Sequence, residues 1–268
     1  MADLKAKAEL TLSWVKGAQD MLGGICAYRI DGKDWADAYC EVTGYLIPTL
    51  VKWGEVRTAL RCADYLVEVQ NPNGSFNGLN SECGAFFDTG ACLEGLQVAW
   101  ELTLSSTYRD AASRAKDWMR RHITDMLARN MEIYQARPSA LVGGESVIEA
   151  WLKPKWDRPL RSHYLAYWLE GVHRMGGNIR EIADGLTITP PHLIPFEYSS
   201  GWEPVAGRYD LCATSQFAAL FGSKTMVEAV AEHVRDDGGV PLDPARSHEA
   251  FSWCAKFFLD AVFAVTHA

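Results

Sequence analysis

The chain has 268 residues, of which 48% are hydrophobic and 22% are charged, and its formal net charge is -8. This length and composition are typical of a soluble protein with one large core, and we expect residues 1–268 to form a single domain. The sequence has no dense Lys/Arg cluster, which argues against a nucleic-acid or anionic-membrane surface because both are recognised mainly through positive charge. An acidic substrate therefore needs a local basic pocket.

Cysteine usage and the N-terminal residues both favour the cytoplasm. The seven cysteines are odd in number and form no C-x-x-C pair, so neither a disulfide framework nor a ribbon-type zinc site is indicated. The first residues are typical of an amphipathic helix rather than a signal peptide, and no run reaches transmembrane length. We therefore predict a cytoplasmic protein without a cofactor, and the oligomeric state stays open.

Hydrophobic periodicity predicts an all-α protein in which apolar helices alternate with amphipathic ones. No run has the pattern of a strand. Pro48 lies inside one apolar segment and implies either a kink or a later helix start. In chain order, helices are expected at residues 3–22, 34–53, 55–70, 87–104, 108–129, 139–151, 162–175, 210–221, 224–235 and 252–265.

Polar residues open three of the apolar segments at regular spacing. Glu41, Asp88 and Ser139 begin successive inner segments on the order of fifty residues apart, which is typical of a helical-hairpin repeat. If the N-terminal helix packs as the outer partner of the last inner helix, about five hairpins close a ring. The stretch at about 187–208 contains four prolines, so we expect an irregular loop there, and long ordered loops are often functional.

Three stretches of sequence indicate a particular fold. They are residues 41–49 (Glu-Val-Thr-Gly-Tyr-Leu-Ile-Pro-Thr), the turn 70–76 (Gln-Asn-Pro-Asn-Gly-Ser-Phe), and 87–90 (Phe-Asp-Thr-Gly) followed by Gly95. They resemble α/α toroid proteins of bacterial polysaccharide gene clusters, in the six-hairpin glycosidase and prenyltransferase-like superfamily. The resemblance implies an α/α toroid with its site at one mouth of the ring and a sugar or oligosaccharide substrate, but it does not specify the reaction.

Glu41 and Asp88 are the candidate acid/base pair of a glycan-active site. Glycosidic cleavage and sugar epimerisation both need carboxyl groups placed on either side of one bond. The alternative for each acid is a helix cap, because an aspartate at a helix start satisfies free backbone N–H groups. The substrate-binding residues expected around the same mouth are Tyr45, Thr89, Asp210 and Gln216.

His163, Arg208 and Tyr209 form a second candidate group, which resembles the site of uronate lyases. The resemblance implies that Arg208 neutralises the carboxylate of the substrate while His163 or Tyr209 acts on the neighbouring proton. Arg208 follows the proline-rich loop and immediately precedes an inner helix, which places it near the mouth. The alternative for His163 is a structural histidine, because a lone histidine carries little positional information.

Asp210, Cys212 and His248 form a third candidate group. They resemble the Asp, Cys and His zinc ligands of protein prenyltransferase β subunits, a ligand set suited to catalytic zinc. The alternative for Cys212 is a small buried hydrophobe, and we expect no metal.

Aromatic side chains complete the candidate site. Tyr198 and Trp202 lie in the irregular loop and have less reason than helical aromatics to be buried, so they are candidates, with Trp253, to stack on a sugar ring. The sequence thus predicts a carbohydrate-active hydrolase, lyase or epimerase acting on a uronate or related sugar of a surface polysaccharide. Two alternatives remain: a non-catalytic toroid that binds a sugar or a protein partner, and a zinc-dependent prenyltransferase-like enzyme.

Overall fold

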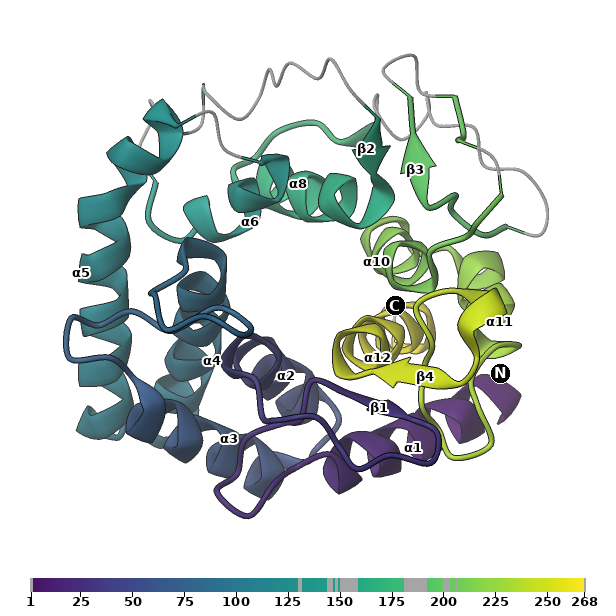
Figure 1. Cartoon of the computed structure of the whole chain (residues 1–268), viewed down its shortest axis with the longest axis horizontal. Coiled ribbons are helices and arrows are strands. Elements are labelled where there is room, and N and C mark those ends of the chain that lie inside the picture. Colours follow the sequence, from purple (N-terminus) through teal and green to yellow (C-terminus); the bar gives the residue numbers. More distant parts are fainter. Residues whose placement is uncertain are drawn as a thin grey trace.

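The helices form a closed ring with an inner and an outer layer (Figure 1). The computed structural model describes residues 2–129, 132–143, 147, 149, 159–180, 192–199, 203–205 and 207–267. In that part of the chain, the inner layer consists of α2 (Cys40–Lys52), α4 (Phe86–Thr103), the short η1 and α6 (Ile133–Gln135 and Ala136–Ser139), α8 (Ser162–Arg174), α10 (Leu211–Phe221) and α12 (Ser252–Thr266). The outer layer consists of α1 (Ala2–Gly17), α3 (Val56–Val69), α5 (Ser106–Ala128) and α11 (Lys224–Ala231).

The two layers follow from how apolar residues are distributed around each helix. Inner helices such as α4 and α10 are apolar on most sides because neighbours surround them, whereas α3 and α5 bury one face and expose the other. Between α2 and α4 the backbones touch: a Cβ added at Gly44 would lie 2.6 Å from the carbonyl oxygen of Ala91, and one at Gly95 would clash with the carbonyl oxygen of Gly44. Glycines therefore set the distance between these two inner helices.

The ring closes where the first and last segments of the chain meet. Helix α1 packs on α12, and α12 also packs on α2. Beside them, β1 (Tyr28–Ile30) pairs antiparallel with β4 (Glu249–Phe251), and the Ser252 N–H donates to the Ala27 carbonyl at 3.0 Å (Figure 1). The prediction that the N-terminal helix is the outer partner of the last inner helix is confirmed.

The prediction of an all-α protein is confirmed, but two short pairs of strands that the sequence did not indicate accompany the helices. Besides β1 and β4, the structure contains β2 (Leu160–Arg161) paired antiparallel with β3 (Glu197–Tyr198). These strands are only two or three residues long, too short to produce an alternating apolar pattern, so periodicity cannot detect them. Both pairs lie at the mouth of the ring where the inner helices α8 and α12 begin, and they tie the loops there together.

Several helix bounds also differ from the predicted ones. The segment expected to begin at Ser139 begins earlier, because Pro138 lies within α6, in the first helical turn where its missing N–H costs nothing. Much of 139–151 falls outside the described residues. Helix α2 starts later than expected, at Cys40, with Pro48 still inside it, while α1 and α11 end early. Among the described residues, none of the helices combines the length and hydropathy that a membrane span requires.

Candidate active site

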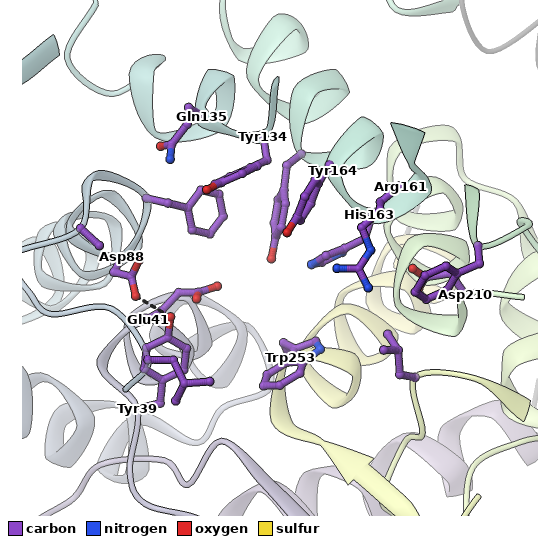
Figure 2. A pocket seen from close by; sticks show the side chains of 16 residues that line it. Tyr39, Glu41, Asp88, Tyr134, Gln135, Arg161, His163, Tyr164, Asp210 and Trp253 are labelled. Carbon is purple, nitrogen blue, oxygen red and sulfur yellow. Dashed lines mark hydrogen bonds between the residues drawn. The ribbon is translucent and has the colours of Figure 1, made fainter. Parts of the chain in front are cut away.

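A cavity of about 390 Å³ opens at the mouth where the inner helices begin (Figure 2). Its volume lies within the range of small-molecule sites. Residues from the N-terminal ends of α2, α4, α8, α10 and α12 line it, together with η1 and the loops that enter these helices. The lining residues are Tyr39, Glu41, Leu79, Ala85, Phe87, Asp88, Tyr134, Gln135, Arg161, His163, Tyr164, Tyr167, Phe196, Asp210, Leu242 and Trp253.

Glu41 and Asp88 lie together at one side of this cavity (Figure 2). Each sits in the first turn of its helix, Glu41 in α2 and Asp88 in α4. Asp88 does not act as the helix cap that the sequence allowed, because the N-cap residue of α4 is Ala85 and no side chain caps it. Instead, the Tyr39 hydroxyl donates a hydrogen bond to Asp88 Oδ1, and the carboxyl group lines the cavity.

The two carboxyl groups differ in acidity. Burial raises the pKa of Asp88 to about 6, although the hydrogen bond from Tyr39 acts to lower it. Burial and the nearby charge of Asp88 raise the pKa of Glu41 to about 8. The two groups titrate as a coupled pair, so the pair retains a proton more readily than isolated carboxyl groups do, and the larger rise favours Glu41 as its carrier. This is the division between a proton donor and a proton acceptor.

The opposite side of the cavity holds two basic residues, Arg161 and His163, with Asp210 beside them (Figure 2). Arg161 lies there with its guanidinium group over the rings of Phe196 and Tyr164, at 4.8 and 5.6 Å from their centroids. Burial acts to lower the pKa of His163, but its contacts with Cys212, Asp210 and Gln216 outweigh burial and raise it to about 9. These contacts favour the protonated form of His163. Arg161 and His163 therefore face the carboxyl groups of Glu41 and Asp88, with the carboxyl group of Asp210 beside them.

Aromatic rings form much of the wall between these two sides. The rings of Phe87 and Tyr167 are 4.7 Å apart, and those of Tyr134 and Tyr164 are also 4.7 Å apart. Trp253, from the first turn of α12, lines the wall nearest the C-terminal strand β4. Flat apolar faces beside polar groups are the surfaces on which sugar rings stack.

Tyr45, Thr89 and Gln216, predicted to bind substrate, do not line the cavity. Tyr45 and Gln216 are fully buried beneath it. Thr89 is also buried, and its hydroxyl accepts a hydrogen bond from the Phe76 N–H at 3.0 Å and donates one to the Ala85 carbonyl at 2.7 Å. These three residues belong to the packing behind the wall. Of the predicted residues, the structure gathers five at the cavity: Glu41, Asp88, His163, Asp210 and Trp253.

Arg208, Tyr209 and Tyr198 do not line the cavity either. Arg208 Nε donates to Asp243 Oδ2 at 2.6 Å, and its guanidinium group covers the Phe196 ring at 4.5 Å from the centroid. The backbone of Tyr209 forms an isolated antiparallel β-bridge with that of Pro195, and Tyr198 is buried in β3. Trp202 lies outside the described residues. Of these two arginines, Arg161 lines the cavity and Arg208 does not.

The three proposed zinc ligands do not come together. Asp210 caps α10 by accepting a hydrogen bond from the Ala213 N–H at 2.8 Å. The buried Cys212 thiol contacts His163 Nδ1 at 3.4 Å, while the exposed His248 lies 3.4 Å from Glu249. Within the described ranges, no group of three or more His, Cys, Asp or Glu side chains has an arrangement that could hold a metal ion.

Comparisons with known proteins identify the fold. No protein-family model and no curated protein matches this chain. Among solved structures, an α-amylase from Clostridium perfringens superposes with a TM-score of 0.68 at 12% sequence identity, covering 97% of each chain. The chain has the α/α toroid fold. An unsaturated glucuronyl hydrolase specific for heparin superposes with a TM-score of 0.67 at 9% identity, covering 99% of this chain and 97% of that one.

Enzymes of a different class share this toroid. The type II terpene cyclase MstE from Scytonema superposes with a TM-score of 0.62 at 12% identity, covering 100% of this chain and 99% of that one. These superpositions establish the toroid fold. Because the sequence identities are so low, the chemistry must be argued from the side chains at the mouth of the ring.

Proposed function

We propose that this toroid is a glycoside hydrolase whose substrate carries an acidic sugar, such as a uronate of a surface polysaccharide. The observation that carries the proposal is the lining of one cavity, in which the coupled carboxyl groups of Glu41 and Asp88 face Arg161 and His163 across an aromatic wall. The names of two similar structures, an amylase and a glucuronyl hydrolase, support a carbohydrate substrate at the level of the fold.

The proposed reaction assigns different tasks to the two carboxyl groups. Glu41, the favoured carrier of the proton, donates it to the glycosidic oxygen as the bond from the anomeric carbon breaks. Asp88, ionised, accepts a proton from the water whose oxygen bonds to that carbon, or attacks the carbon itself as a nucleophile. Tyr39 donates to Asp88 and so holds its carboxyl group in place while favouring the ionised form.

Arg161 and His163 support an acidic rather than a neutral sugar. The protein as a whole carries a net charge of -8 and would repel an anion, so two basic residues inside one cavity are a feature specific to that place. A guanidinium group and a protonated imidazole both donate charge-assisted hydrogen bonds to carboxylates. We therefore assign the acid group of the substrate to the side of Arg161 and the scissile bond to the side of Glu41.

The proposal is tested by incubating the protein with uronate oligosaccharides and with neutral oligosaccharides of equal length. New reducing ends without a rise in the ultraviolet absorbance of a conjugated double bond support the hydrolase. A fall in that absorbance with unsaturated substrates identifies an unsaturated-uronate hydrolase, whereas a rise identifies a lyase and contradicts the proposed reaction. Binding of the oligosaccharides by calorimetry with no turnover supports the alternative of a non-catalytic sugar-binding toroid.

A further inference from the structure

A line of buried polar side chains connects the cavity to the opposite mouth of the ring. It runs from His163 on α8 through Gln216 on α10 to Glu170 on α8 and Arg137 on α6. We infer that Gln216 is a positioning residue, which fixes the proton on His163 Nδ1 and so presents Nε2 to the acid group of the substrate. The role of His163 in binding the substrate rests on the proposed function. The hydrogen bonds from His163 to Arg137 do not depend on it.

Hydrogen-bond directions along the line have a single consistent solution. Glu170 forms an ion pair with Arg137 and so accepts hydrogen bonds, which means that the Gln216 group that it meets at 3.0 Å must be the amide Nε2–H. The Gln216 oxygen must then face His163, and because a carbonyl oxygen accepts only, His163 Nδ1, at 2.7 Å, must carry a proton. The ring nitrogen left for the cavity is Nε2, which in the protonated imidazole is also a donor.

Glu170 is itself held in place. Arg137 Nε donates to Glu170 Oε2 at 2.7 Å, and Arg137 Nη2 donates to Glu94 Oε2 at 2.8 Å. Arg174 Nη2 then donates to the other oxygen of Glu94 at 2.6 Å. The Arg137 side chain is 3% exposed, so Glu170 cannot turn without breaking its ion pair with a buried guanidinium group.

Gln216 acts on the substrate only through His163. It is absent from the lining of the substrate cavity but lines a second cavity, of about 320 Å³, with Glu94, Arg137 and Glu170. This second cavity lies at the end of the ring where the inner helices finish, since it also contains Lys52, Arg174 and Asp260. A change at Gln216 therefore removes no direct contact with a ligand in the first cavity.

Of the groups around His163, Gln216 is the one whose contact fixes the position of the ring proton. From α10, the thiol of Cys212 lies 3.4 Å from Nδ1, and Asp210 adds negative charge that favours the protonated ring. The rings of Tyr164 and Tyr167 from α8 and of Phe257 from α12 pack at 6.2, 4.4 and 6.1 Å between centroids. Those rings restrain the plane of the imidazole, but they do not select which nitrogen is protonated.

The test uses Gln216→Met, which keeps the length of the side chain and removes both hydrogen bonds, and Glu170→Gln, which lets the Gln216 amide turn over. Nitrogen NMR of histidine-labelled protein, recorded through a pH titration, reports which ring nitrogen of His163 keeps its proton. When the His163 ring is neutral, we expect its proton on Nδ1 in the wild type and a mixture of the Nδ1–H and Nε2–H tautomers in each variant. With an acidic oligosaccharide, KM should rise about tenfold, the scale of one charge-assisted hydrogen bond, while kcat and the KM of a neutral analogue stay within about twofold.

Unchanged tautomers in both variants, or equal losses for acidic and neutral substrates, would overturn the inference. Circular dichroism of each variant shows whether it folds, and Glu170→Gln remains as a nearly isosteric variant if Gln216→Met does not. If the wild-type protein cleaves no oligosaccharide, the proposed function fails while the NMR titration still decides whether Gln216 positions His163.

Discussion

Glu41 and Asp88 interact with the same hydroxyl group, that of Tyr39, although they belong to different inner helices. Tyr39 is the N-cap residue of α2, so Glu41 follows it closely in the chain, whereas Asp88 is brought to it by the packing of α4 on α2. The glycine contacts between these helices set that approach. The separation of the two carboxyl groups is thus a property of the helix pair and not of a flexible loop.

The first prediction concerns the dependence of the rate on pH. Glu41 must be protonated and Asp88 ionised, and their pKa values are about 8 and about 6. Activity should therefore fall below about pH 6 as Asp88 gains a proton, and above about pH 8 as Glu41 loses one. A profile of kcat against pH measures both limits. A rate that keeps rising well above pH 8 would exclude Glu41 as the proton donor.

Replacing Asp88 separates catalysis from helix stability. Asp88 caps no helix, so Asp88→Asn should leave the melting temperature nearly unchanged while kcat falls roughly 100- to 10,000-fold. Glu68→Gln, an exposed acid on α3, is the control and should have full activity. Full activity in Asp88→Asn would show that the carboxyl group takes no part in the reaction.

Glu41 should destabilise the folded protein at high pH. Its pKa is raised on folding from an ordinary value near 4.5 to about 8, so the folded state favours the protonated form. This contribution to stability is fully present below the ordinary pKa and is lost as the pH rises through 8. Glu41→Gln, which mimics the protonated form, should therefore raise the melting temperature at about pH 9 by about 2–4 °C for each kcal/mol regained. Scanning calorimetry at about pH 4 and pH 9 checks this, and an equal shift at both would contradict it.

Arg161 and Arg208 give a matched pair for substrate charge. Both guanidinium groups lie over Phe196, but only Arg161 lines the cavity, and Arg208 is paired with Asp243. Arg161→Gln should raise KM for an acidic oligosaccharide about tenfold and leave a neutral one unaffected. Arg208→Gln should change either value by less than about twofold. A large rise in KM for the acidic oligosaccharide in Arg208→Gln, with little change in Arg161→Gln, would show that Arg208 binds the acid group of the substrate.

The close approach of α2 and α4 can be tested through stability. Gly44→Ala places a methyl group 2.6 Å from the Ala91 carbonyl oxygen, which should cost about 1–3 kcal/mol of unfolding free energy and lower activity with it. Gly17→Ala is the control, because a Cβ there meets nothing within 4 Å. Urea denaturation of both variants gives the comparison, and equal stability of the two would show that α2 and α4 can move apart without loss.

The sequence predicted the parts of the site that depend on local pattern. Inner helices are apolar on most sides and begin with an acid followed by small residues, so the positions of Glu41 and Asp88 at helix starts were accessible from the chain alone. Gln135 was accessible too and was missed: Asp88 and Gln135 are separated by the same number of residues as Glu41 and Asp88. Following that spacing further would have placed the third inner segment correctly.

The rest of the site depends on contacts between distant segments. Arg161 is the second residue of the two-residue strand β2. Nothing in its sequence neighbours distinguishes it from Arg208 until β2 pairs with β3 and both guanidinium groups lie over Phe196. The line from His163 to Arg137 likewise joins residues whose partners lie on other inner segments. Periodicity describes one helix at a time and cannot report such pairings.

The pairing of β1 with β4, which closes the ring, has a consequence for biosynthesis. Glu41 and Asp88 are translated early, but the wall that contains Trp253 exists only after β4 has left the ribosome and joined β1. Until then the nascent chain is an open arc with its inner apolar surfaces uncovered, a state in which chaperones bind and truncated products aggregate. The candidate site is therefore completed in one late event, and a chain that ends before β4 lacks the wall that contains Trp253.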